Sequence, residues 1–204
     1  MFTYVFVDPV NGQRSPRGKV TAIALVVVGA VVLSTATVLG LHWATASSRK
    51  APPMGQAQGS GFTRLDRMAP ALLLPSLSGS GTVSITKLAG KPIVLNFWAS
   101  TCGVCKSETP ALASVARTLG GKVTFVGIDS VDQHGPAMAF ITKYHVTYPI
   151  GFDPQGTMAI KYGVIGLPVT FFLSPSGKTI MGENIGALSS STLRTILRNL
   201  YGTA

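Results

Sequence analysis

Cysteine is scarce in this chain. Only two of its 204 residues are cysteines, and they lie three positions apart, at Cys102 and Cys105. A structural zinc site needs four ligands, usually two such pairs or one pair with nearby histidines. Because there is no second pair, and because His42, His134 and His145 are isolated in the sequence, we expect no metal site. A purely structural disulfide is also disfavoured, since so short a loop would constrain the unfolded chain little.

Acidic side chains are also few. The chain has seven Asp and Glu against 17 Lys and Arg, which gives a formal net charge of +10. Such an excess can indicate a nucleic-acid-binding protein. However, five of the 17 basic residues flank the apolar run described below, and the remaining 12 are scattered, without a basic run or interleaved aromatic residues. We therefore expect no nucleic-acid partner.

Charge is absent from one long segment, residues 20–41. As a helix, this segment would be roughly 33 Å long, which is enough to cross the apolar core of a bilayer. Arg14, Arg17 and Lys19 precede it, and positive charge favours the cytoplasmic side of a membrane. The sequence therefore predicts a single-pass protein of the cell membrane, with a cytoplasmic segment over 1–19, a transmembrane anchor over 20–41, a flexible linker over 42–62 and an extracytoplasmic domain over 63–204.

A cleaved secretory signal peptide is the alternative interpretation of this apolar segment. Ala44-Thr45-Ala46 resembles the small-residue sequence at which such peptides are cut. The apolar stretch is longer than the roughly 7–15 residues that are usual in signal peptides, and this favours a retained anchor.

Strands and helices alternate in the predicted domain. Short apolar runs bounded by Gly, Pro or polar residues predict strands, and apolar residues at three- and four-residue steps predict helices. Strands are expected over 71–74, 82–85, 92–98, 123–129, 169–173 and 178–181, and helices over 105–119, 136–144, 157–162 and 189–200. The first two and the last two strands are expected to form hairpins. This order predicts an α/β domain with helices packed around a mixed sheet.

The two cysteines lie between the predicted strand 92–98 and the predicted helix 105–119. The C-x-x-C spacing lets two thiols close a reversible disulfide, and between a strand and a helix it is typical of a thioredoxin-type redox site. No further thiol is left unpaired, which suits the oxidising conditions outside the cytoplasm.

Several stretches match one known family. They are 93–99, Cys102-x-x-Cys105, Glu108-Thr109-Pro110, Tyr162-Gly163-Val164, 167–171 and 174–178. On these residues the chain resembles the membrane-tethered, extracytoplasmic thioredoxin-like proteins of the TlpA/ResA/CcmG group. The resemblance implies a thioredoxin-like fold with a central mixed β-sheet flanked by helices, an N-terminal β-hairpin extension and a single N-terminal transmembrane helix. We also expect a monomer without a bound cofactor.

The resemblance implies roles for individual residues. Cys102 would be the attacking thiol at a helix N-terminus, where the helix dipole favours a thiolate, and Cys105 would resolve the mixed disulfide. Pro168 matches the family's cis-proline, and Leu167 would offer its backbone groups to a bound substrate strand. Trp98 matches a family tryptophan and would pack at the substrate-binding surface.

Glu108 matches an acid that this group carries three residues after the second cysteine, and it would exchange a proton with Cys105. Cytosolic thioredoxins instead use a buried Asp, whose position is occupied here by Asn96. The alternative for Glu108 is a helix-face carboxylate favoured near the helix N-terminus. Two features depart from the family: Thr101 replaces a usual Trp, and Gly103-Val104 replaces a frequent x-Pro. Both affect the redox potential and the partner surface.

The sequence therefore predicts a thiol–disulfide oxidoreductase that reduces disulfides in exported proteins. The resemblance implies apocytochromes c as substrates, as in cytochrome c biogenesis, and a membrane electron-relay protein as donor. One alternative is a disulfide-forming oxidant of the same fold. Another is a copper carrier that uses both thiolates with His134 or His145. A peroxidase is disfavoured because the residues before Cys102 lack the Pro-x-x-x-Thr-x-x-Cys pattern.

Overall fold

The structure, a computed structural model, describes residues 55–56 and 61–203. The predicted cytoplasmic segment 1–19, the predicted anchor 20–41 and most of the predicted linker 42–62 lie outside these residues. Within the described ranges, no helix has the length and the apolar character that a membrane span requires.

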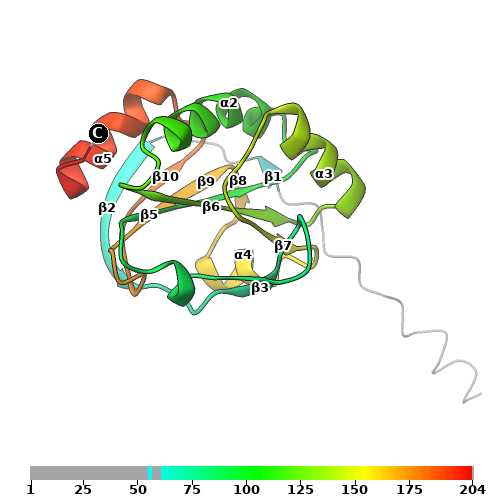
Figure 1. The fold of residues 1–204 in the computed structure, drawn as a ribbon, viewed down its shortest axis with the longest axis horizontal. Helices are drawn as coiled ribbons and strands as arrows, with labels where there is room; N and C mark the ends of the chain where they lie inside the picture. The colour runs from blue at the N-terminus through cyan, green and yellow to red at the C-terminus, as the bar shows by residue number, and fades with distance from the viewer. Residues whose placement is uncertain (1–54, 57–60, 204) are drawn as a thin grey trace, which may run out of the picture. The chain divides into compact units, whose positions relative to one another are not determined.

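A six-stranded mixed sheet lies at the centre of the domain (Figure 1). Its strand order is β2 (Gly61–Met68), β10 (Thr179–Ile185), β9 (Val169–Leu173), β5 (Ile93–Trp98), β6 (Thr124–Ser130) and β7 (Ile150–Asp153). Strands β5, β6 and β7 are parallel, whereas β9 is antiparallel to β5, and β10 is antiparallel to both β9 and β2. The predicted mixed sheet is therefore confirmed.

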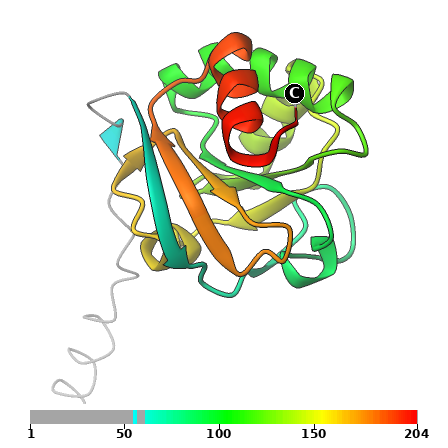
Figure 2. The same ribbon diagram turned by 90° about the vertical axis from the view of Figure 1, so that its left-hand side faces the viewer.

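Helices cover both faces of this sheet, as Figures 1 and 2 show from two directions. One face carries α2 (Gly103–Thr118), α3 (His134–Lys143) and α5 (Ser190–Tyr201). The other face carries α4 (Thr157–Tyr162) and a two-stranded antiparallel sheet of β3 (Leu73–Pro75) and β4 (Thr82–Ser84), which the short 3₁₀ helix η1 (Thr86–Leu88) follows. β3 overlaps the predicted strand 71–74 and ends one residue beyond it, and β4 lies within the predicted strand 82–85.

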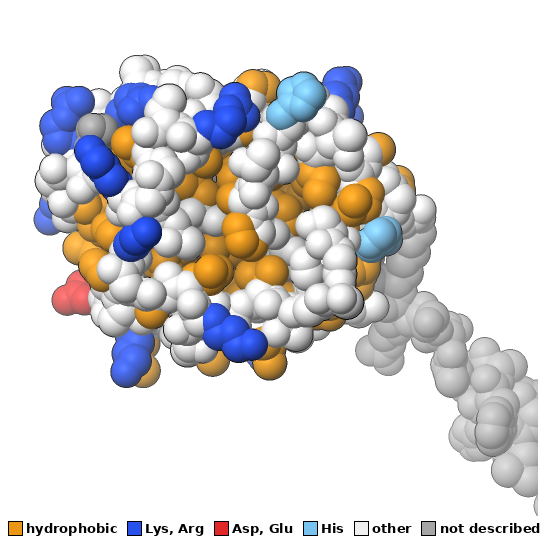
Figure 3. Space-filling model, in the orientation of Figure 1, with side chains coloured by type: hydrophobic (Ala, Val, Ile, Leu, Met, Phe, Trp, Pro, Cys, Tyr) orange, Lys and Arg blue, Asp and Glu red, His pale blue; other side chains and the backbone are white. Residues whose placement is uncertain are grey.

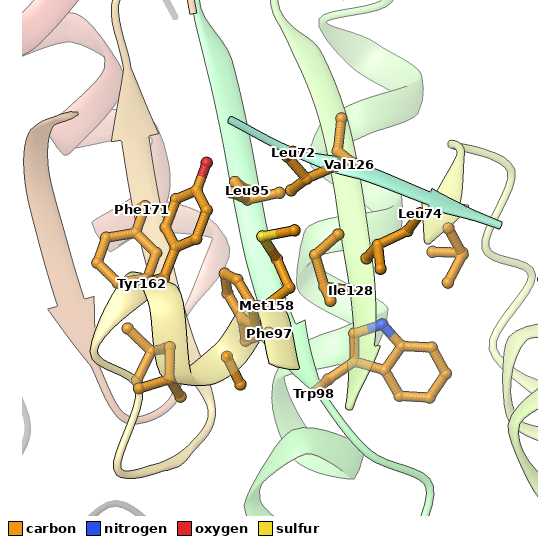
Figure 4. Close-up of a cluster of buried hydrophobic side chains, with 14 of the residues drawn as sticks. Leu72, Leu74, Leu95, Phe97, Trp98, Val126, Ile128, Met158, Tyr162 and Phe171 are labelled. Atoms are coloured by element: carbon orange, nitrogen blue, oxygen red, sulfur yellow. The ribbon is translucent and has the colours of Figure 1, made fainter. Parts of the chain in front are cut away.

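Strand β5 is buried along its whole length because both faces of the sheet are covered. Its side chains alternate between the faces. Val94 packs into the core beneath α2 and α5, whereas Leu95 and Phe97 pack into the core on the α4 side. Figure 4 shows the second core, in which Leu95 and Phe97 meet Leu72, Leu74, Val126, Ile128, Met158 and Tyr162. The strand that leads into the cysteines is thus held from both sides.

The predicted helices 105–119, 136–144, 157–162 and 189–200 are confirmed, with ends that differ by two residues or fewer. The predicted hairpin of 169–173 and 178–181 is confirmed as β9 and β10.

The sequence interpretation missed β2 and β7. β2 is an edge strand that carries Arg64, Asp66 and Arg67, so it lacks the apolar alternation of a half-buried strand, although charged residues are common on sheet edges. Strand β7 is only four residues long and includes Gly151, where a Cβ atom would come within 3.2 Å of side-chain atoms of Leu74 and Ile128. Close packing at this position therefore favours glycine, which is a weak strand former.

Candidate active site

The two cysteines form a disulfide bond at the N-terminus of α2, with their Cα atoms 5.3 Å apart. Cys102 is the N-cap residue of this helix, and its sulfur accepts a hydrogen bond from the backbone N–H of Cys105 at 3.1 Å. Cys102 is 5% exposed and Cys105 is fully buried. The unpaired N–H groups at a helix N-terminus favour negative charge, so this position stabilises a thiolate when the disulfide opens.

The cysteine motif lies where it does because β5 ends directly before it. Residues Ala99–Thr101 form a turn in which the backbone N–H of Cys102 donates to the carbonyl of Ala99 at 3.1 Å. The buried strand therefore fixes one end of the turn, and α2 fixes the other. The arrangement of strand, turn, cysteine pair and helix agrees with the sequence-based expectation.

The peptide bond between Leu167 and Pro168 is cis, as the sequence resemblance predicts. It joins the two-residue strand β8 (Gly166–Leu167) to β9. Because β9 is antiparallel to β5 and Val169 is the register partner of Phe97, this peptide bond lies at the end of β5 that leads into the cysteines. The structure therefore brings the predicted proline to the same end of the sheet as the cysteine pair.

Glu108 lies on α2, one helical turn after Cys105, and is 1% exposed. Its carboxyl oxygens accept hydrogen bonds from the side-chain amide of Asn96 at 2.8 Å and from the backbone N–H of Leu188 at 3.1 Å. The Asn96 amide also donates to Thr170 at 3.0 Å. Burial raises the pKa of Glu108 from 4.5 to about 7, against the opposing effect of the Asn96 and Leu188 hydrogen bonds. A buried carboxyl that titrates near neutral pH can take up or release a proton, and this one lies one helical turn along α2 from Cys105.

Trp98 is only 3% exposed, and its ring stacks on Phe140 of α3 with the centroids 4.5 Å apart. The side chain of Leu167 is likewise 2% exposed. Both residues lie beside the site, but their side chains offer little surface to a substrate. Because Trp98 is buried, it contributes to packing at the site. Leu167 can offer its backbone groups to a substrate.

One apolar side chain near the cis-proline was missed by the sequence interpretation. Ile165 precedes β8 directly and is 92% exposed. An isoleucine that follows a short helix and a glycine gives no sequence signal that distinguishes a surface residue from a core residue. Its exposure makes it a candidate contact for a substrate strand at β8.

Asp132 was also missed. Its carboxylate accepts a hydrogen bond from the backbone N–H of Ser100, within the turn before Cys102, at 2.5 Å. The two residues are 32 positions apart, and only the parallel pairing of β5 and β6 brings them together. The ends of neighbouring parallel strands meet at one edge of a sheet, and this was the available signal.

The described residues contain no group of three or more His, Cys, Asp or Glu side chains placed to hold a metal ion. His134, which the copper-carrier alternative invokes, makes a hydrogen bond of 2.9 Å with the carbonyl of Leu77 and packs its ring against Phe152. On the face shown in Figure 3, Lys and Arg side chains are separated from one another around an area of hydrophobic side chains.

The chain is similar to known proteins in a family match and in two sequence comparisons. Residues 65–180 match the AhpC/TSA family. The chain is 31% identical over 133 residues to a thiol:disulfide interchange protein DsbE from Pseudomonas fluorescens, a match that covers 65% of this chain and 72% of that protein. It is also 31% identical over 149 residues to a thiol-disulfide oxidoreductase ResA from Oceanobacillus iheyensis, with 67% and 73% covered.

Solved structures agree with these sequence relatives. A DsbF homologue from Corynebacterium diphtheriae superposes with a TM-score of 0.61 at 26% identity and covers 73% of this chain and 96% of its own. A secreted Mycobacterium tuberculosis disulfide oxidoreductase homologous to E. coli DsbE superposes with a TM-score of 0.57 at 30% identity, with 63% and 96% covered. The predicted thioredoxin-like α/β fold is therefore confirmed.

Proposed function

The chain belongs to the AhpC/TSA family and is a thiol–disulfide oxidoreductase, and from this premise we propose that it reduces disulfide bonds in exported proteins. The observation that carries the proposal is the Cys102–Cys105 disulfide at the N-terminus of α2, with the buried Glu108 one turn further along the helix. Dithiol exchange needs two thiols that can form a disulfide and a group that accepts a proton, and the cysteine pair and Glu108 supply them.

In the proposed reaction the reduced protein begins with the thiolate of Cys102. This thiolate attacks one sulfur of the substrate disulfide, so that a mixed disulfide forms and one substrate thiolate leaves. The thiol of Cys105 then loses its proton and attacks the Cys102 sulfur, which releases the second substrate thiolate and closes the Cys102–Cys105 disulfide. Two electrons pass to the substrate, and the two substrate thiolates leave without protons. The one proton that the protein releases comes from Cys105, so the substrate thiolates take up any further protons from water. The protein ends in the oxidised form that the structure represents.

Glu108 takes the proton of Cys105 in this proposal. Both residues lie on the inner side of α2, and the Glu108 carboxyl has a pKa of about 7 because of burial. A group with such a pKa is partly ionised at neutral pH and can both accept a proton and return it. The backbone amide of Leu188 and the side-chain amide of Asn96 keep the carboxyl in place.

The proposed substrate strand binds beside the cis-proline, along β8. In the structure this short strand already pairs with β1 (Gly55–Gln56), with Gln56 as the register partner of Leu167. That pairing supports the idea that the edge of β8 can accept an extended chain through backbone hydrogen bonds. Ile165, exposed just before β8, supplies an apolar contact for a side chain of the substrate.

The proposed location is outside the cytoplasm, on a membrane anchor. The uncharged segment 20–41 and the basic residues before it support the anchor, and the secreted relative from M. tuberculosis supports the location. A membrane electron-relay protein as donor and apocytochromes c as substrates are the specific partners that the sequence resemblance suggests. The C-x-x-C-H cysteines of an apocytochrome c would be presented as an extended segment, which β8 can bind.

The reduction potential of the Cys102–Cys105 pair tests the direction of electron flow. The full chain in detergent is equilibrated with glutathione or dithiothreitol buffers, and the oxidised fraction is measured. A potential near or below about −220 mV supports a reductase, and a potential near −120 mV would assign the protein to disulfide formation instead.

Two cysteine variants test the proposed order of steps. We expect C102S to abolish the reduction of a model disulfide substrate, because it removes the attacking thiol. We expect C105S to accumulate a mixed disulfide between Cys102 and the substrate, because the resolving thiol is gone. Full turnover by C105S would contradict the two-cysteine mechanism.

A further inference from the structure

Two acidic residues, Asp129 and Asp132, lie next to the turn that precedes Cys102. Strands β5 and β6 are parallel, and Trp98 and Asp129 are register partners at their carboxyl ends. The chain then turns after β6 and places the carboxylate of Asp132 on the backbone N–H of Ser100, at 2.5 Å. The other oxygen of Asp132 accepts the backbone N–H of Gln133 at 2.7 Å. Asp132 therefore connects the turn before Cys102 to the start of α3.

Asp129 is unusual because it is fully buried and neither of its carboxyl oxygens has a hydrogen-bond donor among the described residues. An ionised carboxylate is strongly disfavoured in such surroundings. Burial raises the pKa of Asp129 to about 9, and the charges of Asp132 and Asp153 add to this effect. The carboxyl is therefore protonated at neutral pH, and its O–H needs an acceptor.

The surroundings of Asp129 identify that acceptor. One carboxylate oxygen of Asp153, at the end of β7, accepts the backbone N–H groups of Met158 and Ala159 at 3.0 and 3.1 Å, at the start of α4. His134 of α3 packs against Phe152, the β7 register partner of Asp129, but is bonded to the carbonyl of Leu77. Among the described residues, the side chain of Asp132 lies within hydrogen-bonding reach of Asp129, whereas Asp153 acts on Asp129 through its charge alone. Asp132 also accepts the backbone N–H of Ser100 in the cysteine turn.

The geometry points to a positioning role for this acidic pair: we propose that Asp129 and Asp132 share one proton and together hold Ser100, so that the turn before the attacking cysteine keeps its conformation. The inference rests on the proposed function of Cys102. The protonated Asp129 donates to Asp132, and Asp132 accepts from Ser100. Loss of the shared proton would put two negative charges side by side, one buried on Asp129 and one partly buried on Asp132, next to a site that must also carry a thiolate.

The turn between the two acids is strained in a way that fits this role. Val131 has a φ of +55°, a conformation that β-branched residues rarely adopt. Its backbone N–H donates to the carbonyl of Asp153 at 3.0 Å, which ties the turn to β7. Backbone strain of this kind is concentrated at functional sites. Here the strained residue directly precedes Asp132, whose carboxylate accepts the backbone N–H of Ser100.

The test is the reactivity of Cys102 in the reduced full chain in detergent, measured as the rate of alkylation by iodoacetamide between pH 5 and 10, with the modified cysteine identified by mass spectrometry. D66N is the matched control, because Asp66 is exposed on β2, away from the sheet end that carries the cysteines. In the wild type and in D66N, we expect the rate to rise as the thiol ionises and to show a second inflection above pH 8, where the acidic pair loses its proton.

D132A removes the acceptor of the Ser100 N–H. We expect at least a threefold slower alkylation at pH 7, because the turn no longer holds the sulfur of Cys102 at the helix N-terminus. D132N keeps an acceptor oxygen, so we expect its rate at pH 7 to stay within twofold of the wild type. D129N replaces the shared proton by a permanent amide donor. We expect a wild-type rate at pH 7 and no inflection above pH 8.

Two results would overturn the inference: a D132A rate equal to that of D66N, or an inflection that persists in D129N. If D132A does not fold, the comparison of D129N with D66N decides the question alone. Alkylation requires no substrate disulfide. A failure of the proposed reductase activity would therefore appear in turnover, whereas a failure of this inference would appear in the pH profile.

Discussion

Two buried carboxyl groups lie close to the cysteine pair, and their surroundings differ. Glu108 accepts two N–H donors, from Asn96 and Leu188, whereas Asp129 has no donor among the described residues. The donors favour ionisation of Glu108 and thus partly offset the effect of burial. Glu108 therefore titrates near neutral pH, where a proton carrier is useful, while Asp129 keeps its proton to higher pH.

The raised pKa of Glu108 makes the stability of the oxidised protein depend on pH. The folded carboxyl binds a proton more tightly than the unfolded chain does, so its stabilising contribution is complete below about pH 4.5 and is lost as the pH rises to about 7. E108Q lacks this titration. Between pH 4.5 and 8 we therefore expect the free energy of unfolding of E108Q to rise relative to the wild type by up to about 3 kcal/mol.

Urea unfolding of both oxidised proteins at several pH values measures this difference. Asp129 also has a raised pKa, but it is present in both proteins, so its contribution cancels in the comparison. A difference between E108Q and wild type that stays constant from pH 4 to 8 would mean that Glu108 has an ordinary pKa in the folded protein.

At the scale of elements, α5 closes the sheet face on which α2 lies. Leu193 and Leu197 are fully buried in the core that contains Val94 and Leu112, so α5 supports the helix that carries the cysteines. The start of α5 also contributes a hydrogen bond to the site, since the backbone N–H of Leu188, just before the helix, donates to Glu108. The beginning of this helix thus affects both stability and the proton acceptor.

Ser189 is the N-cap residue of α5, and its hydroxyl accepts the backbone N–H of Thr192 at 3.1 Å. We expect S189A to lower the free energy of unfolding by about 1 kcal/mol, the usual cost of losing such a cap. S190A is the matched control, because it changes the neighbouring serine and leaves the cap in place. Urea unfolding compares the two. Equal stabilities would show that the Ser189 hydroxyl does not support the helix.

The sequence predicts those elements that have a strong local pattern. β5 is a continuous apolar run and α2 has apolar residues at helical spacing, so both could be located without a structure. Edge strand β2 could not be located from the sequence. It is mostly exposed, and its charged residues interrupt the apolar alternation that predicts a strand. Among the site residues, the cysteines follow from their spacing and Glu108 follows from the family resemblance, whereas the contact between Ser100 and Asp132 depends on the register of two strands.

At the scale of the whole molecule, the cysteines, the cis-proline and the acidic pair all lie at one end of the central sheet. Cys102 follows β5, Asp129 lies at the carboxyl end of β6 and Pro168 precedes β9, so three neighbouring strands each contribute one part. The other end of the sheet carries none of these groups. A domain of this kind can act on large substrates only if that one end faces them, and the proposed membrane anchor would decide in which compartment it does so.

The proposed anchor gives the last prediction. If 20–41 spans the membrane with 1–19 in the cytoplasm, we expect the full chain to sediment with membranes, and we expect trypsin added to intact spheroplasts to release the folded domain by cutting after Arg49 or Lys50. These residues lie between the apolar segment and the described domain. A cytoplasmic protein is the control for intact cells and must survive the treatment.

Each alternative gives a different result in the same experiment. A cleaved signal peptide would leave the domain soluble outside the cytoplasm before any trypsin is added. The opposite orientation would leave the domain bound to the membrane and protected until the spheroplasts are lysed. Release by trypsin from intact spheroplasts would establish that the redox site faces the compartment in which exported proteins acquire and lose disulfide bonds.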